Sequence, residues 1–111
     1  CRTLALKGAQ VIAHSCNLVM PYCQKAMVTR CLENRVFAVT ANRIGIEKRG
    51  DDCFDFTGGS QITSTNGTIL SSADNKSSSI SIVEVDLAQA NDKMISKYND
   101  LLKDRRTEFY F

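Results

Sequence analysis

Three neighbouring side chains near the N-terminus are of types that take part in chemistry: His14, Cys16 and Asn17. A histidine can act as the base that activates a thiol, and residues two apart in an extended chain lie on the same face. No carboxylate that would orient the histidine is evident, which weighs against a His14–Cys16 pair. The Asn17 amide could instead contact a ligand, or it could bond to its own backbone and cap the loop.

The residues around this group predict a strand, a polar loop and a helix. Val11 to Ala13 is a short apolar run suited to a buried strand, and residues 14–17 form the loop after it. Pro21 fixes φ and lacks a backbone donor, as is typical of the first residue of a helix, here residues 21–35. Ligands in open α/β sheets bind outside the carboxyl ends of strands, so the loop is where a substrate is expected. Steps of three and four residues place one face of the helix at Cys23, Met27, Arg30/Cys31 and Asn34.

The rest of the chain predicts further strands and helices. Residues 1–7 read as a helix that Gly8 closes, with Leu4 and Ala5 facing the sheet. The charged stretch 44–54 reads as a solvated loop. The other expected elements are a central strand at 36–41, hairpin strands at 60–65 and 68–72 around Asn66-Gly67, a strand at 79–85, and a helix from Asp86 to about Tyr98.

Several motifs in a fixed order carry a resemblance to a known family. The stretches AHSCNLVMPY, TRCLENRVFAVTANRIG, FTGGSQIT and VEVDL follow one another along the chain. In this order they resemble the nitrilase/amidase (carbon–nitrogen hydrolase) superfamily over essentially the whole sequence. The resemblance implies an α/β fold, the C-terminal half of a nitrilase-like α-β-β-α sandwich, with residues 1–111 as a single partial domain.

The resemblance also implies a function. Family members hydrolyse nitriles or amides through a cysteine nucleophile, a glutamate base and a lysine, and by motif all three would precede residue 1. Arg2 matches an arginine downstream of the nucleophile, so Cys1 is not its equivalent, and we expect no catalytic residue in this chain. Asn17 matches a position that lines the substrate pocket, and it is our candidate for binding the amide or nitrile.

Two hypotheses about function follow from this resemblance. The chain is either the C-terminal segment of such a hydrolase, inactive alone, or a catalytically incompetent, self-associating remnant with a structural or binding role. We expect no cofactor and no metal. The partner is expected to be a second copy of the chain or the missing N-terminal half, because half of a shared sandwich would expose apolar strand faces.

Two further groups of residues are expected to act in structure or at interfaces. Arg30 and Glu33 are three apart and can pair on a helix surface. The resemblance implies that Arg30, Glu33 and Asn34 tie the helix to neighbouring loops and subunits; a solvated charge pair is the alternative. The tail, residues 98–111, ends in Phe109, Tyr110 and Phe111, which we expect to pack on a neighbouring subunit, or otherwise on the chain's own core.

Composition excludes several classes of protein. A net charge of +2 is too small to indicate nucleic-acid binding. No apolar run approaches the roughly 18 residues of a membrane span. Five cysteines without C-x-x-C spacing indicate neither a zinc site nor a redox motif. No signal peptide is visible, so we expect a cytoplasmic protein. Because Cys1 stands in place of an initiating methionine, we expect the chain to be a fragment, a processed piece or a chain whose beginning was trimmed.

Overall fold

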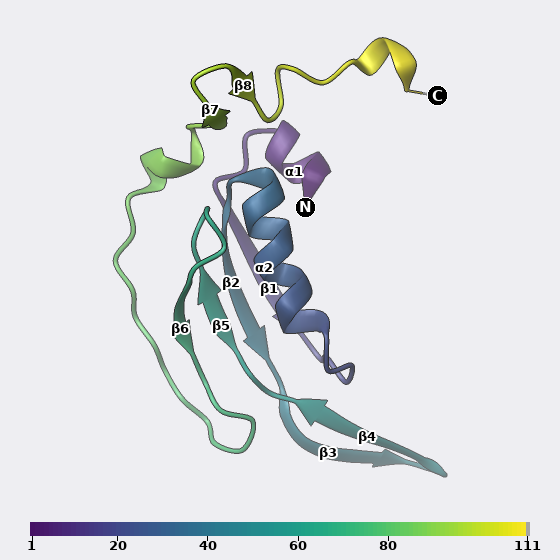
Figure 1. Ribbon diagram of the computed structural model, residues 1–111. Coiled ribbons are helices and arrows are strands. Elements are labelled where there is room, and N and C mark those ends of the chain that lie inside the picture. Colours follow the sequence, from purple (N-terminus) through teal and green to yellow (C-terminus); the bar gives the residue numbers. More distant parts are fainter. Residues whose placement is uncertain (111) are drawn as a thin grey trace.

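A mixed four-stranded sheet forms the centre of the computed structural model, which describes residues 1–110 (Figure 1). The strand order is β1-β2-β5-β6, with β1 and β2 parallel and the other two pairs antiparallel. These strands are β1 (Val11–Cys16), β2 (Phe37–Asn42), β5 (Gln61–Thr63) and β6 (Ile69–Ser72). The α/β class and the central place of the strand predicted at 36–41 are confirmed.

Helix α2 (Cys23–Asn34) covers one face of the sheet and supplies much of the core. Met27, Cys31 and Asn34 are buried, as the predicted helix face requires, whereas Arg30 is exposed. Met27 and Cys31 cluster with the buried side chains of Ala5, Ile12, Val36 and Ala38. The helix begins at Cys23 rather than Pro21, because the chain turns at Pro21 and Tyr22 before the helix starts. It ends at Asn34, and the cap residue Arg35 has the left-handed conformation with φ of +46°.

The short helix α1 (Arg2–Leu6) confirms the helix predicted at the N-terminus, but only one of its two proposed contacts. Ala5 is buried against the core, whereas Leu4 is 50% exposed. Successive residues of a helix point about 100° apart, so a helix of five residues on the edge of a core buries only one narrow side. Gly8 follows with φ of +89°, the left-handed conformation predicted for it.

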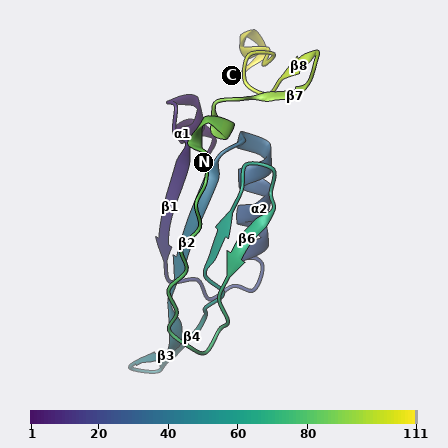
Figure 2. The same ribbon diagram turned by 90° about the vertical axis from the view of Figure 1, so that its left-hand side faces the viewer.

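The face of the sheet that α2 does not cover remains largely apolar and open. Side chains alternate along a strand, so Val11, Val39 and Ala41 point away from α2, and all three are exposed. Figure 2 shows residues 77–86 running along this side, opposite α2. The molecule is accordingly thin, 52 × 37 × 19 Å, with room for one helical layer and one sheet.

The stretch 44–54, predicted to be a charged loop, is instead most of a hairpin. Strand β3 (Ile44–Arg49) pairs antiparallel with β4 (Asp52–Thr57), and Gly50 turns between them with φ of +58°. The hairpin projects beyond the carboxyl ends of β1 and β2 (Figure 1). Most side chains of this projecting ribbon are exposed and Phe56 is buried, so its charged residues are compatible with strand structure and the charge pattern was misleading.

The hairpin predicted around Asn66-Gly67 is confirmed as β5 and β6. The Thr68 N–H donates to the Asn66 side-chain oxygen at 3.0 Å, and Gly67 has φ of +82°. A Cβ added to Gly67 would lie 3.4 Å from a Val28 methyl carbon, so the turn lies close to α2.

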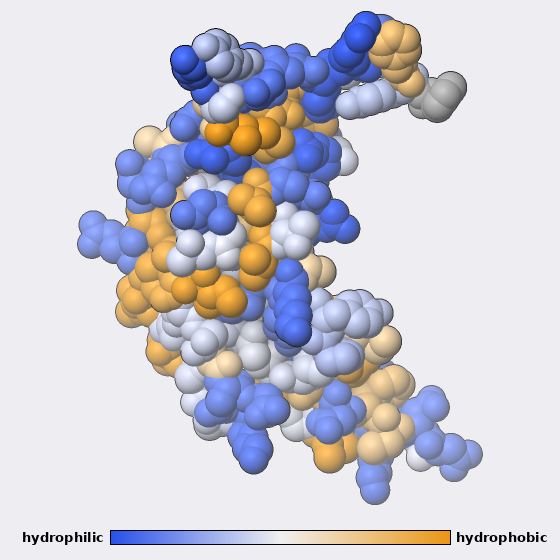
Figure 3. All heavy atoms as spheres, in the orientation of Figure 1, coloured by the Kyte–Doolittle hydropathy of each residue, from blue (hydrophilic) through white to orange (hydrophobic). Residues whose placement is uncertain are grey.

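The strand predicted at 79–85 is wrong: this segment has no strand partner within residues 1–110, and Ile80 is 93% exposed. Figure 3 shows apolar surface on the left, where this segment and β6 run.

The long helix predicted from Asp86 is also wrong, although its cap is correct. The Asp86 carboxylate accepts a hydrogen bond from the Ala88 N–H, but the helix is a single 3-10 turn, η1 (Leu87–Ala90). The Met94 N–H then donates to the Asp92 side chain, and a short hairpin follows, β7 (Met94–Ser96) and β8 (Asn99–Asp100). Contacts with the end of α2 fix this segment, and helix propensity alone could not reveal them.

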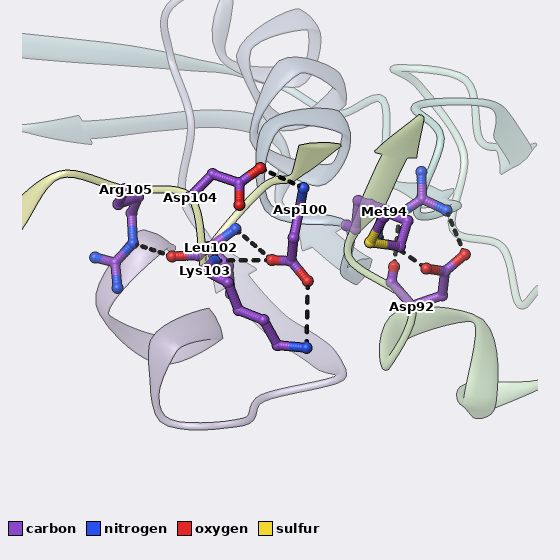
Figure 4. Close-up of polar contacts among 8 residues, drawn as sticks. Asp92, Met94, Asp100, Leu102, Lys103, Asp104 and Arg105 are labelled. Atoms are coloured by element: carbon purple, nitrogen blue, oxygen red, sulfur yellow. Dashed lines mark hydrogen bonds and ion pairs between the residues drawn. The ribbon is translucent and has the colours of Figure 1, made fainter. Parts of the chain in front are cut away.

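The C-terminal tail is held by local carboxylate turns, shown in Figure 4. The Asp100 carboxylate accepts hydrogen bonds from the Leu102 and Lys103 N–H groups, at 2.9 and 2.8 Å. A last 3-10 turn, η2 (Thr107–Phe109), follows. Phe109 and Tyr110 are each 62% exposed, so neither packs on the chain's own core, and Phe111 lies outside the described residues. Their contact with another subunit stays a prediction.

Within residues 1–110, none of the helices has the length and apolar character to cross a bilayer.

Candidate functional site

Asn17 is the first residue after β1, at the carboxyl ends of the two parallel strands. The loop begins at Asn17 and not at His14 as predicted, because β1 continues in register with β2 as far as the Cys16–Asn42 pair. This is still the edge of the sheet at which ligands bind in α/β proteins. Among residues 1–110, no hydrogen bond to the Asn17 side chain is found, so the amide does not cap its own loop.

Asn17 lines a hollow of about 280 Å³ at this edge. The far wall of the hollow is the β3–β4 hairpin, which contributes charged side chains on β3 and two aromatic rings on β4. The complete lining is Asn17, Val19, Arg43, Glu47, Arg49, Phe54 and Phe56. An apolar wall with a few polar groups is the composition usual for small-molecule sites.

Two arginines hold the carboxylate in this wall. Arg49 and Arg43 each pair with one oxygen of Glu47. Their hydrogen bonds, that of Arg49 first, lower the pKa of the Glu47 carboxyl below its ordinary value. The Arg43 guanidinium also lies 4.4 Å from the centre of the Phe56 ring. The three side chains leave one positive charge beside Asn17.

This wall was not predicted from the sequence, because residues 44–54 were expected to form a loop. Glu47 and Arg49 are two apart, so on a strand they share one face, and a period of two would have brought them together.

The backbone on both sides of Asn17 is fixed by other strands. The Arg43 N–H donates to the Cys16 carbonyl at 3.2 Å. The Leu18 N–H donates to the Asn42 side-chain oxygen at 2.7 Å, and the Leu18 carbonyl accepts from the Thr57 N–H at 2.9 Å. The loop is therefore held at the residue before Asn17 and at the residue after it.

The structure gives His14 and Cys16 no arrangement for nucleophilic catalysis. His14 Nδ1 lies 3.3 Å from the Thr40 hydroxyl, and the Cys16 thiol donates to the Ala41 carbonyl at 3.6 Å. Burial, and then the nearby Cys23, raise the pKa of the Cys16 thiol. The reactive form of cysteine is the thiolate, so this environment favours the unreactive form. Burial likewise raises the pKa of the Cys31 thiol, to about 11.

Arg30, Glu33 and Asn34 form a local cluster at the end of α2. Arg30 and Glu33 pair at 2.7 Å on the helix surface, as their spacing predicts, and the hydrogen bond from Arg30 lowers the pKa of Glu33. Asn34 is fully buried; its Nδ2 donates to the Arg30 carbonyl at 2.8 Å, whereas its Oδ1 has no partner within residues 1–110. The ties to other segments run through backbone carbonyls: Arg2 donates to that of Glu33 at 2.7 Å. A role at a subunit interface stays a prediction.

No group of three or more histidine, cysteine or carboxylate side chains that could hold a metal ion occurs within residues 1–110.

Comparison with known proteins places this geometry in a family. The family model described as carbon–nitrogen hydrolase matches residues 1–93. The chain is 50% identical over 110 residues to a nitrilase of Pyrococcus abyssi, covering 99% of this chain and 40% of that protein. It is 37% identical over 108 residues to an (R)-stereoselective amidase of a Pseudomonas species, covering 95% of this chain and 37% of that protein. The chain thus spans well under half the length of these two relatives.

Solved structures agree on the fold. A carbon–nitrogen hydrolase from Helicobacter pylori G27 superimposes with a TM-score of 0.72, 23% identity, 98% coverage of this chain and 42% of that one. An amidase of the nitrilase superfamily from Nesterenkonia AN1 gives a TM-score of 0.57 at 23% identity, covering 68% of this chain and 28% of that one. With a family model matching most of its length and a relative at 50% identity, the chain belongs to the carbon–nitrogen hydrolase family of the nitrilase superfamily.

Proposed function

We propose that this chain forms the C-terminal part of a carbon–nitrogen hydrolase that acts on an amide or a nitrile. The reactive cysteine, glutamate and lysine would then belong to a segment that precedes residue 1. Both relatives support this reading, since one is a nitrilase and the other an amidase, and the chain spans 40% and 37% of their lengths.

The observation that carries the proposal is the placement of Asn17. Its side-chain amide has no hydrogen-bond partner within residues 1–110 and lines a hollow with Phe54 and Phe56. A carboxamide has two donors and an acceptor, so it can bind the carbonyl oxygen or the nitrogen of an amide, or the nitrogen of a nitrile. In this role Asn17 orients the substrate and performs no bond-making step.

The chemistry of hydrolysis supports reactive groups outside this chain. Acyl transfer needs an activated nucleophile, a base and a stabiliser of the oxyanion. Cys16 has a raised thiol pKa, and the Glu47 carboxylate is neutralised by two arginines. Neither is suited to the role of nucleophile or base, so we assign both to the scaffold.

The open face of the sheet supports a covering partner. Val11 is 38% and Val39 43% exposed on the face away from α2. Covering them with another sheet layer would remove about 25 cal/mol of unfavourable free energy for every Å² of apolar surface buried. We propose that the preceding half of the protein, or a second copy of the chain, lies on this face.

The test is activity of the natural gene product that contains this chain. We expect ammonia release from a panel of butyramide, acrylamide and butyronitrile, and we expect Asn17→Ala to reduce kcat/KM at least tenfold through the loss of a substrate hydrogen bond. Asn75→Ala, at an exposed loop asparagine, is the matched control and should leave kcat/KM unchanged.

Two results would contradict the proposal. An unchanged kcat/KM in Asn17→Ala would remove the assigned binding role. A natural product of 111 residues that self-associates in light scattering and releases no ammonia would instead establish the catalytically incompetent remnant.

A further inference from the structure

We propose that Asn42 and Thr57 are positioning residues, which hold the loop so that the Asn17 amide faces the hollow. The inference rests on the proposed function, because it assigns how the substrate-binding residue of that site is held. Neither side chain lines the hollow itself. Asn42 ends β2 and Thr57 ends β4, so the loop is fixed from two strands that belong to different sheets.

The two side chains bind both backbone groups of the residue after Asn17. Asn42 Oδ1 accepts the Leu18 N–H at 2.7 Å, and the Thr57 hydroxyl donates to the Leu18 carbonyl at 3.0 Å. With its N–H and carbonyl both engaged, the peptide groups on either side of Leu18 have little freedom to rotate. The direction of the Asn17 side chain depends on that rotation.

The hydrogen-bonding capacity of the Thr57 hydroxyl is fully used. A hydroxyl has one donor and two acceptor sites. The donor binds the Leu18 carbonyl, while the oxygen accepts from Asn42 Nδ2 at 3.1 Å and from Gln24 Nε2 at 3.0 Å. Valine has the same shape without the hydroxyl and would break all three contacts, whereas serine can form them.

Asn42 uses both ends of its amide. While Oδ1 accepts from Leu18, Nδ2 donates to the Thr57 hydroxyl and to the Gly58 carbonyl, the latter at 2.7 Å. Aspartate keeps the acceptor and loses both donors, so Asn42→Asp separates the hold on Leu18 from the link to Thr57 and Gly58. A displacement of about 1 Å in a binding group can reduce turnover by as much as a hundredfold, so such a loop affects function without touching substrate.

The direct test is amide hydrogen exchange at Leu18 in the full natural protein. In Thr57→Val we expect exchange at Leu18 to be at least tenfold faster, with Thr57→Ser restoring the original rate. The matched control is Thr40→Val, which removes a buried hydroxyl from β2 that contacts His14 and not the loop. Should Thr57→Val fail to fold, Asn42→Ala, which removes the acceptor of the Leu18 N–H, is measured in the same way. Leu18 exchange equal to that of the Thr40→Val control would overturn the proposal.

A double-mutant cycle tests whether the two residues act through Asn17. We expect Thr57→Val to reduce kcat/KM for butyramide about tenfold in the wild-type background and to have no further effect in Asn17→Ala. If Thr57→Val reduced kcat/KM by the same factor in both backgrounds, the two residues would act independently and the positioning role would be overturned. An unaltered kcat/KM in Asn17→Ala alone would contradict the proposed function, and Leu18 exchange would still decide the positioning role, so the two failures are distinguishable.

Discussion

The ammonium group of Lys93 donates a hydrogen bond to the backbone carbonyl of Asn34 at 2.9 Å, across 59 residues of sequence. A second bond from the same group reaches the Arg35 carbonyl at 2.8 Å. The last carbonyls of a helix have no partner within the helix and carry partial negative charge, so a cation is favourable here. This contact joins the segment that follows η1 to the end of α2.

Lys93→Met should therefore destabilise the fold. The variant keeps the length of the side chain but removes the donor to two carbonyls at the end of α2, and we expect a loss of about 1–3 kcal/mol in the free energy of unfolding. Urea denaturation measures it. Lys25→Met, at an exposed position of α2, is the control and should change the stability by less than about 0.5 kcal/mol. Equal effects of the two substitutions would contradict this assignment.

Gly58 is a position where a close contact with neighbouring backbone makes a larger side chain destabilising. Its φ is +54°, and an added Cβ would lie 2.6 Å from the Asn75 Cα and 2.9 Å from the Ile44 side chain. Gly50 has nearly the same φ, +58°, with no atom within 4 Å of its Cβ position. Both alanine variants carry the strain of a positive φ, and only Gly58→Ala adds a collision with backbone.

We expect Gly50→Ala to be destabilised by about 1 kcal/mol and Gly58→Ala by about 3 kcal/mol or more, because overpacking is added to the same backbone strain. Thermal unfolding of the two variants side by side gives the difference. Similar losses in both would mean that the loop around Asn75 moves aside freely.

The elements that the sequence predicted well are those held by local signals. Asn66-Gly67 requires a turn, and the spacing of Met27 and Cys31 requires a buried helix face, so both were found. The segment 79–85 alternates like a strand, but a strand needs a hydrogen-bonded neighbour, and no local pattern reports whether one is present. The helix predicted after Asp86 failed for a similar reason, since Lys93 binds the end of α2.

The residues of the candidate site were likewise predicted only in part. Asn17 was identified through its resemblance to a family motif, whereas Arg43, Glu47 and Phe56 were not, because their meeting depends on the β3–β4 hairpin. Charged residues such as Lys48 and Asp52 made that hairpin look like a loop. Ile44 and Ile46, and likewise Phe54 and Phe56, alternate with other residues as in a strand, but the neighbouring charges outweighed that signal.

The Asp74 turn gives a prediction for pH dependence. Hydrogen bonds from the Ser77 hydroxyl and N–H and from the Lys76 N–H lower the pKa of the Asp74 carboxyl to about 2. The folded value is below the ordinary one, so the turn is stabilised above an ordinary aspartate pKa of about 3.9 and loses this stabilisation as pH falls through about 2.

At pH 3, therefore, most Asp74 side chains should still be ionised, which carboxyl-carbon NMR shifts would report. Ser77→Ala removes the largest cause of the shift and should raise the midpoint toward the ordinary value. An Asp74 midpoint near 4 in the unsubstituted protein, or no response to Ser77→Ala, would contradict the role of these hydrogen bonds.

Cys16 provides the test of whether the reactive nucleophile lies outside this chain. Its thiol donates to the Ala41 carbonyl and to Asn42 Oδ1, each at 3.6 Å, and burial raises its pKa. Thiol–acceptor bonds of this kind are weak, so alanine removes little beyond a small apolar group. We expect Cys16→Ala to leave kcat/KM of the full natural protein within about twofold, and labelling with a thiol-directed amide analogue to occur at a cysteine of the segment that precedes residue 1, not at any of the five cysteines of this chain. Loss of turnover by a hundredfold or more, with the folded state intact by circular dichroism, would make Cys16 the nucleophile, because removing an attacking group eliminates the covalent step itself.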